Sequence, residues 1–246
     1  MGKGVIILLF LAVTAGCDNI KNLDRASQQP ERAKTLNVSS SNLEKVPASI
    51  GEMTGLQELN LFRNKIDSLP DFIGNLTELE NLSLQSNRLV WVTPKLSALK
   101  KCRKLNLRFN RLESLPNEIC EMENLVELDL RNNRLKSLPC CLGKLQKLEY
   151  LYLSDNMLET LPEEIGQLTH LKVLYLSSNN VSEPMPESYG ELSNLTELDV
   201  SRMGSVVQLP ASLQNCRKLE LLIIDNGTVL PYSTGRGNPR LKVIYR

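Results

Sequence analysis

The sequence predicts an α/β solenoid, in which short repeats stack so that their strands form a parallel sheet on one face and their helical turns line the other. Two observations carry this prediction. Aliphatic residues recur at a step of 23 residues, and each unit holds an asparagine at the same point among them. A fixed period of this length is typical of a stacked array of supersecondary units. The clearest unit covers residues 148–170.

Each unit combines a strand with a helical turn. Leu151 and Leu153 flank Tyr152, and this alternation predicts a short strand with one face turned inward. Ile165 and Leu168 are three residues apart and follow Pro162, which suits the first position of a helical turn. One such unit has no partner for its apolar faces, so it becomes stable only when neighbouring coils cover it.

An asparagine marks the end of the strand in six successive repeats. Its amide can both donate and accept, so it can satisfy backbone groups that the turn leaves unpaired inside the stack. We therefore predict a structural asparagine ladder. The ladder stops where the repeat step lengthens from 23 to 24 residues and Met203 and Gly227 take its place, so we expect looser coils at the C-terminal end. The ladder residues are Asn64, Asn87, Asn110, Asn133, Asn156 and Asn179.

The repeat LxxLxLxxNxLxxLPxxIGxL resembles the leucine-rich repeat in its 23-residue form, which is found in Ras-suppressor-like scaffolds, plant resistance-type proteins and many bacterial surface proteins. The resemblance covers about nine repeats within residues 33–229. It implies a horseshoe solenoid with a concave parallel β-sheet, short helical turns on the convex side, and a binding role.

Residues 1–16 are predicted to be a lipoprotein signal peptide. They contain Lys3 followed by a short apolar run, too short to span a bilayer, and the segment ends in Thr-Ala-Gly before Cys17. This ending resembles a bacterial lipobox, although Thr14 stands where leucine is usual. The resemblance implies acylation of Cys17 and a lipid-anchored place in the cell envelope, at the outer membrane or cell surface rather than the inner membrane. The alternatives are an ordinary signal peptide, or a cytosolic scaffold if the leader is not real.

The two ends of the solenoid are predicted to be caps. Residues 17–32 form a tether and an N-terminal cap, with a short helix over residues 22–28 that ends before Pro30. Residues 230–246 form the C-terminal cap, with a glycine-rich turn and a last edge strand. We expect this cap to cover Leu221 and Ile223, which are apolar at positions that face solvent in other repeats.

The cysteines predict buried thiols and no structural disulfide. Cys102 and Cys216 occupy the first leucine position of their repeats, so we interpret them as small core residues. Cys140 and Cys141 are adjacent in sequence, and a bridge between neighbours would be strained. The only histidine is His170, so no metal site is expected.

Charge and composition argue against nucleic-acid binding and against catalysis. The formal net charge is +1, whereas nucleic-acid binding calls for a strong basic footprint. No nucleophile with a base, paired carboxylates or phosphate-cradling loop stands out from the repeat pattern. We expect a monomeric, non-enzymatic protein with no cofactor, whose only membrane contact is a lipidated Cys17.

The candidate binding residues are those that point out of the concave sheet, and tyrosine and arginine beside apolar area are typical of protein-binding hot spots. The alternative is that tyrosine simply suits exposed strand positions. The predicted site comprises Tyr150, Tyr152, Tyr175, Val173 and Phe109, with Arg108, Arg131, Asp129 and Asp155 around them.

A row of basic residues, Lys65, Arg88, Arg111 and Arg134, follows four ladder asparagines and is a second candidate, for an anionic glycan or an acidic protein surface. Basic residues are, however, frequent at this position of the repeat. The function predicted from the sequence is a protein-binding module on the bacterial cell envelope. The alternative is a structural envelope component that contacts glycan or other envelope proteins.

Overall fold

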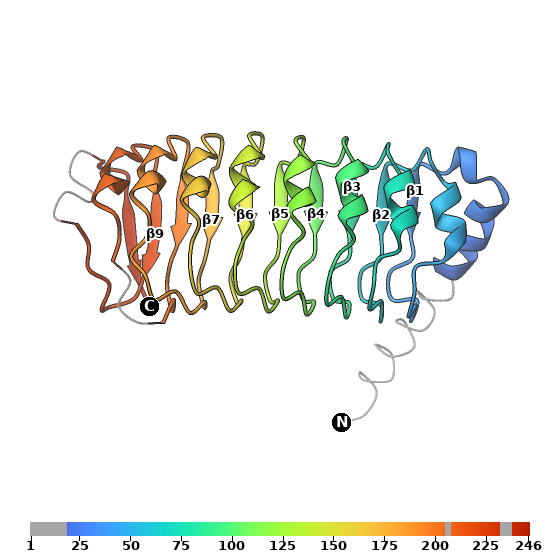
Figure 1. Cartoon of the computed structure of the whole chain (residues 1–246), viewed down its shortest axis with the longest axis horizontal. Helices are drawn as coiled ribbons and strands as arrows, with labels where there is room; N and C mark the ends of the chain where they lie inside the picture. The colour runs from blue at the N-terminus through green and yellow to red at the C-terminus, as the bar shows by residue number, and fades with distance from the viewer. Residues whose placement is uncertain (1–18, 205–207, 232–237) are drawn as a thin grey trace, which may run out of the picture.

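In the part of the chain that the structure describes, ten short strands form one sheet, in which the order in space is the order in sequence, from β1 to β10, and every neighbouring pair is parallel. This computed structural model describes residues 19–204, 208–231 and 238–246. The coils stack side by side along one axis (Figure 1). The predicted solenoid with a parallel sheet is confirmed. The strands are β1 (Thr35–Asn37), β2 (Glu58–Asn60), β3 (Asn81–Ser83), β4 (Lys104–Asn106), β5 (Glu127–Asp129), β6 (Tyr150–Tyr152), β7 (Val173–Tyr175), β8 (Glu197–Asp199), β9 (Leu221–Ile224) and β10 (Lys242–Tyr245).

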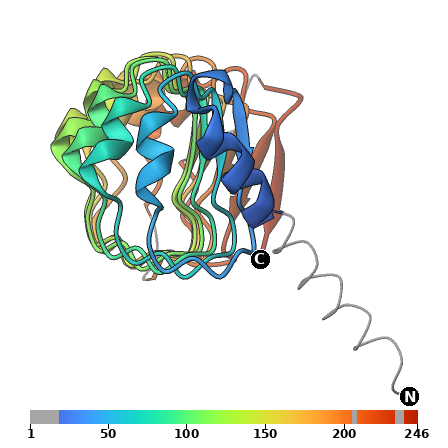
Figure 2. The ribbon, with the colours of Figure 1, turned by 90° about the vertical axis from the view of Figure 1, so that its right-hand side faces the viewer.

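The helical turns on the opposite face are short 3₁₀ helices rather than α-helices. In η7, the amide of Leu168 donates to the carbonyl of Ile165, and Pro162 lies just before the first helical residue. The elements are η1 (Pro30–Arg32), η2 (Ala48–Glu52), η3 (Asp71–Asn75), η4 (Pro94–Ala98), η5 (Asn117–Glu121), η6 (Cys140–Lys144), η7 (Glu163–Gln167), η8 (Glu187–Glu191) and η9 (Ala211–Asn215). Figure 2 shows the helical turns and the sheet as two layers, with the middle coils displaced toward the helical side, so that the sheet is the concave face.

One continuous core fills the space between the layers. The central residue of each strand points into it, and Leu151, for example, is fully buried. At the N-terminal end residues 19–28 are helical and place Leu23 against this core, so the helix includes at least three residues before the start that the sequence predicted. In the third repeat, where proline is replaced, the buried Thr93 hydroxyl accepts from the amide of Lys95 and donates to Asp71 at 2.6 Å. Thr93 thus begins η4 with a side-chain cap.

Each ladder asparagine links its own coil to the preceding one. The carboxamide oxygen of Asn156 accepts from the amide of Leu135 at 3.1 Å, while its nitrogen donates to the carbonyls of Leu130 and Leu153 at 3.0 and 2.9 Å. Asn64, Asn87, Asn110, Asn133 and Asn179 repeat this geometry and are buried. The ladder asparagines therefore provide partners for backbone N–H and C=O groups buried inside the stack.

The C-terminal end closes with β10, which pairs in parallel with β9. In the register of the sheet, Ile223 lies between Asp199 and Ile244 and is buried, whereas Leu221 is half-buried. The predicted edge strand is therefore present, and it shields Ile223 more fully than Leu221. The glycine-rich stretch at residues 232–237 lies outside the described residues.

The predicted signal peptide and Cys17 also lie outside the described residues. Among the residues that are described, no helix has the length and apolar character needed to cross a membrane. Lipidation of Cys17 therefore stays a prediction.

The prediction of no structural disulfide is wrong. Cys120 and Cys141 form a disulfide that joins η5 to η6, with their Cα atoms 5.8 Å apart. The bridge is possible because stacking brings turns of consecutive repeats together, although the two cysteines are 21 residues apart in sequence. Cys102 and Cys216 are buried free thiols, as predicted, and Cys140 is an exposed thiol.

Candidate binding surface

The register of the sheet places the predicted aromatic residues in two adjoining rows on the concave face. In the first row Tyr150 stands beside Val173, and in the second row Tyr152 stands beside Tyr175. Both pairs belong to the neighbouring strands β6 and β7. Because equivalent residues of successive repeats pair directly, the exact step of 23 residues is what brings these side chains together.

The rings of Tyr152 and Tyr175 are in edge-to-face contact, with centroids 5.5 Å apart. The guanidinium carbon of Arg131 lies 4.5 Å from the centroid of the Tyr152 ring. Both are favourable geometries for aromatic and cation–π contacts. The predicted residues Arg131, Tyr152 and Tyr175 therefore form one contiguous cluster, and all three are half-buried.

Asp129 fixes the position of the Arg131 side chain by an ion pair. Its side chain is only 4% exposed, and its two oxygens accept from Nε and Nη2 of Arg131 at 2.9 and 2.5 Å. This pairing is the main cause of the raised pKa of Arg131. One oxygen also accepts from the backbone amide of Arg131 at 3.1 Å. Asp129 therefore holds the guanidinium over Tyr152 and has little capacity left for an external partner.

Glu197 is a site residue that the sequence did not single out. The hydroxyl of Tyr175 donates to its carboxylate. Burial raises the pKa of Tyr175, and the hydrogen bond to Glu197 raises it further. Glu197 lies diagonally across from Tyr175, since Val173 is its direct neighbour in the register. That register, read from the repeat step, is the signal that could have identified it.

A carboxylate on the other side of the cluster affects the ionisation of Tyr152. Burial is the main cause of the raised pKa of Tyr152, and the negative charge of Glu127 adds to the effect. Glu127 is the direct neighbour of Tyr150 in the register. The tyrosines thus lie between carboxylates on β5 and β8.

The remaining predicted residues extend or flank the cluster. Val173 is buried beside the half-buried Tyr150, and Asp155 is exposed just beyond the end of β6. Arg108 and Phe109 make a contact of their own, with the guanidinium carbon 4.5 Å from the ring centroid. Phe109 is exposed and belongs to the fourth coil, so it stands at the margin of the tyrosine cluster.

A hollow of this face, with a volume of about 560 Å³, lies beside the cluster rather than over it. It covers the strands from β1 to β5 and is lined mainly by polar side chains, with Glu127 at its border. The concave face therefore offers a polar hollow at its N-terminal half and an aromatic cluster at its centre.

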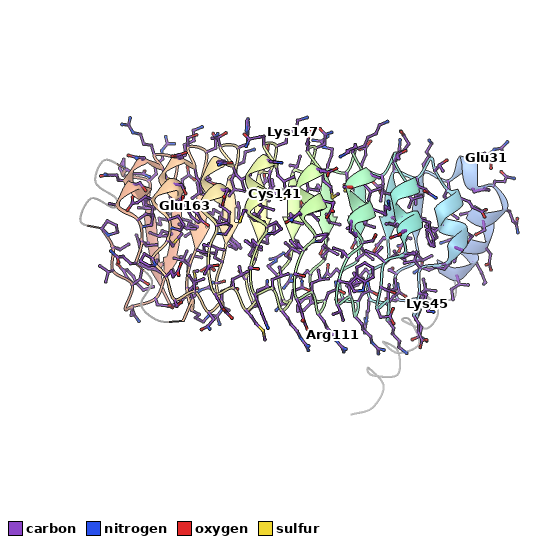
Figure 3. All side chains as sticks on the ribbon, in the orientation of Figure 1. Glu31, Lys45, Arg111, Cys141, Lys147 and Glu163 are labelled. Atoms are coloured by element: carbon purple, nitrogen blue, oxygen red, sulfur yellow. A yellow bond between two sulfur atoms is a disulfide. The ribbon has the colours of Figure 1, made fainter. Side chains whose placement is uncertain are left out.

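The second predicted row lies on a different surface. Figure 3 shows Arg111 projecting from the lower edge of the solenoid, opposite to Lys147 on the upper edge. Lys65, Arg88 and Arg134 hold the equivalent position in their repeats, and among the described residues the four cations form no ion pair. These cations are accessible to a partner, but they are not part of the concave surface.

Candidate metal ligands are not grouped in the part of the chain that the structure describes. Within residues 19–204, 208–231 and 238–246, no three side chains of histidine, cysteine, aspartate or glutamate gather so that they could hold a metal ion. The concave surface presents aromatic area, carboxylates, and the guanidinium groups of Arg108 and Arg131, each of which lies over a ring. These groups suit non-covalent recognition.

Comparison with known families identifies the repeat. Models of three families match the chain: a leucine-rich repeat region over residues 93–178, a leucine rich repeat over residues 31–89, and another over residues 170–192. Together they cover most of the solenoid. No curated protein gives a significant sequence match.

Solved structures show the same architecture. A leucine-rich repeat protein of Leptospira interrogans is 30% identical, with a TM-score of 0.77 over 92% of this chain and 64% of that one. An internalin of Listeria monocytogenes is 22% identical, with a TM-score of 0.78 over 89% of this chain and 62% of that one. A plant peptide hormone receptor is 24% identical, with a TM-score of 0.69 over 86% of this chain and 35% of that one. The chain thus spans less than two thirds of each of these proteins.

Proposed function

Since this chain is a leucine-rich repeat protein, a family whose members are in general protein-binding modules, we propose that it is a non-enzymatic receptor for a protein partner, held on the bacterial cell envelope. The partner docks on the concave sheet. The observation that carries this proposal is the tyrosine cluster of Tyr150, Tyr152 and Tyr175, with Arg131 stacked upon it.

The cluster has the properties of a binding hot spot. Its rings are half-buried, and the rings of Tyr152 and Tyr175 are held in place by contact with each other and, for Tyr152, with Arg131. Little rotamer entropy is therefore lost from these two side chains when a partner covers them. Tyrosine and arginine are also the side chains most often found at the energetic centre of protein interfaces. The plant peptide hormone receptor with the same fold was solved in complex with RGF2, which supports a peptide or protein ligand.

Envelope display rests on the N-terminal sequence and is supported by the cysteines. We propose that Cys17 is acylated after removal of residues 1–16. A disulfide such as Cys120–Cys141 persists in oxidising compartments outside the cytosol, which favours export over the cytosolic scaffold. Metabolic labelling with a palmitate analogue should mark the wild-type protein and leave Cys17→Ala unmarked. Equal labelling of both would remove the lipid anchor from the proposal.

The binding surface is tested by changing the three tyrosines together to serine. Their side chains lie outside the leucine core, so the fold should lose only about 1 kcal/mol of stability or less. Affinity for the partner that wild-type protein captures from envelope or host lysate should fall by roughly 30-fold, or about 2 kcal/mol. Circular dichroism and thermal melting report the fold, and titration with the captured partner reports affinity.

The matched control replaces Lys65, Arg88, Arg111 and Arg134 with glutamine. Arg111 lies on the lower edge (Figure 3), and the other three residues hold the equivalent position in their repeats, so the control should bind the partner as wild type does. If instead the tyrosine variant keeps full affinity and the lower-edge variant loses it, the binding surface is the edge. That result would favour a structural envelope component that grips anionic glycan or acidic protein.

A further inference from the structure

The two halves of the concave face differ in charge. The outward-facing positions of the coils that contain β5 to β8 hold five carboxylates and two guanidinium groups. The carboxylates are Glu127, Asp129, Asp155, Glu197 and Asp199, and the cations are Arg131 and Arg202. The corresponding positions of the coils from β1 to β4 hold Glu58 against Arg63, Lys104 and Arg108. The tyrosine cluster lies in the acidic half.

Two of the five carboxylates are already used inside the protein. Asp129 is paired with Arg131. Asp199, which is also nearly buried, accepts from the amide and the hydroxyl of Ser201 at 3.0 and 2.7 Å and lies 3.6 Å from Arg246. These two groups are therefore structural.

The other three carboxylates remain open to a ligand. Glu127 has only an exposed contact with Lys104 at 3.3 Å, which solvent weakens. Glu197 accepts one hydrogen bond, from Tyr175, and a carboxylate has room for several more. Among the described residues, the exposed carboxylate of Asp155 has no partner. Together they leave an uncompensated negative charge on both sides of the aromatic rings.

The rings themselves suit a cation. The face of Tyr152 already carries the guanidinium of Arg131 at 4.5 Å, which shows that this environment stabilises a positive charge over an aromatic ring. Burial raises the pKa of Tyr175, and the charges of Glu197 and Asp199 add to it, so the local field disfavours further negative charge. The same field attracts a positive one.

From these contacts, and building on the proposed protein-binding function, we infer that the partner presents a basic segment. Its lysine or arginine side chains lie on Tyr150 and Tyr175 and pair with Glu127, Asp155 and Glu197. Ionic contacts to three partly solvated carboxylates set specificity and association rate, while the tyrosines contribute the apolar part of the affinity. An acidic segment would be repelled by these carboxylates. A purely apolar segment would remove water from them without offering a hydrogen-bonding or ionic partner.

The test uses the full-length protein and two short fluorescent peptides, one of alternating arginine and glycine and one of alternating glutamate and glycine. The arginine peptide should bind more tightly, and its affinity should fall as salt rises. Changing Glu127 and Glu197 to glutamine and Asp155 to asparagine in one variant should weaken that binding by about tenfold or more. Fluorescence anisotropy measures each affinity.

A matched variant removes the same charge elsewhere. Glu58, Glu118 and Glu163 become glutamine, of which Glu58 lies in the other half of the sheet and Glu163 on the helical face (Figure 3). It should bind the arginine peptide within about twofold of wild type, a change well below 1 kcal/mol. A preference for the glutamate peptide, no binding of either peptide, or equal loss in both variants would overturn the inference.

Failure of the basic-segment inference can be distinguished from failure of the proposed function by comparing the two variants with the captured partner. If the captured partner is lost by the triple tyrosine variant but binds the carboxylate variant as well as wild type at every salt concentration, the concave face binds protein and the basic segment is wrong. If the triple tyrosine variant keeps full affinity for the captured partner, the concave site itself is wrong.

Discussion

At the scale of single residues, the ladder asparagine is the polar group on which each coil depends. In Asn156, the carboxamide oxygen accepts from a backbone N–H of the preceding coil, and the nitrogen donates to two backbone carbonyls. Removing the side chain would therefore leave these buried backbone groups without a hydrogen-bond partner, in a place that water cannot reach. A leucine at the core contributes only apolar burial, and its neighbours can partly relax around a smaller side chain. The asparagine has no such alternative, since no other side chain at that position offers both an acceptor and two donors of the same reach.

Asn156→Ala should therefore lower the free energy of unfolding by about 1–3 kcal/mol. Urea denaturation followed by circular dichroism measures the change. Asn180→Ala is the control, because Asn180 is exposed one position beyond the ladder and should alter stability by less than about 0.5 kcal/mol. Equal effects of the two changes would mean that the ladder is not a source of stability.

The buried thiols predict a dependence of stability on pH. Burial raises the pKa of Cys102 from 9.0 to about 12 and that of Cys216 to about 11. Below pH 9 both the folded and the unfolded thiol are protonated, so stability is unchanged. Above pH 9 the unfolded thiol ionises first, so stability falls as pH rises, by up to about 1.4 kcal/mol per pH unit for each thiol.

Unfolding free energies measured between pH 7 and pH 10 test this. Wild type should be level to about pH 9 and then decline, and Cys102→Ala should decline less steeply over the last unit. The comparison is of slopes, so any cavity left by the shorter side chain does not affect it. A wild-type curve that stays level to pH 10 would show that the thiols are not held protonated by burial.

At the scale of elements, close approach of the helical turns depends on glycine. A Cβ added to Gly166 in η7 would lie 2.3 Å from the carbonyl oxygen of Ser188 in η8, well inside contact distance. Gly166→Ala should lower the free energy of unfolding by about 1–3 kcal/mol, since backbone must move to make room. Gly227→Ala is the control, because a Cβ there meets nothing within 4 Å. Thermal melts that shift equally would refute the packing argument.

The disulfide between η5 and η6 shows where element-level prediction from the sequence fails. A search for disulfides that considers only cysteines at equivalent repeat positions, or adjacent in the chain, misses the pair Cys120 and Cys141. These two cysteines are 21 residues apart, two fewer than the repeat step. They can still form a bridge because consecutive helical turns lie close together, and this closeness comes from stacking rather than from any one repeat. The same holds for Tyr175 and Glu197, whose contact runs diagonally between strands.

At the scale of the whole molecule, the repeat step determines most of the architecture. A step of 23 residues places each strand from β1 to β7 beside the equivalent strand of the neighbouring coil, so the order and register of this part of the sheet follow from the positions of the leucines. It also predicts that Tyr150, Tyr152 and Tyr175 share one face. The step does not predict which polar side chains pair across that face, because this depends on side-chain reach and burial at each site.

Stability should likewise vary along the stack, because each coil contacts only its neighbours. The N-terminal end is covered by the helix over residues 19–28, through Leu23. At the other end Met203 and Gly227 replace the ladder asparagine, and β10 has only β9 beside it. Each missing asparagine removes hydrogen bonds worth about 1 kcal/mol apiece from the C-terminal coils.

Native-state hydrogen exchange, resolved by peptide, should therefore show a gradient. Amides of β5 to β7 should be the most protected, and those of β9 and β10 should exchange about tenfold faster or more, a difference of about 1.4 kcal/mol in local opening. Met203→Asn provides the internal control, since restoring the ladder should slow exchange at β8 and β9 and leave β2 and β3 unchanged. Uniform protection along the sheet would mean that the solenoid opens as a single cooperative unit, and that the loss of the ladder at its C-terminal end has no energetic consequence.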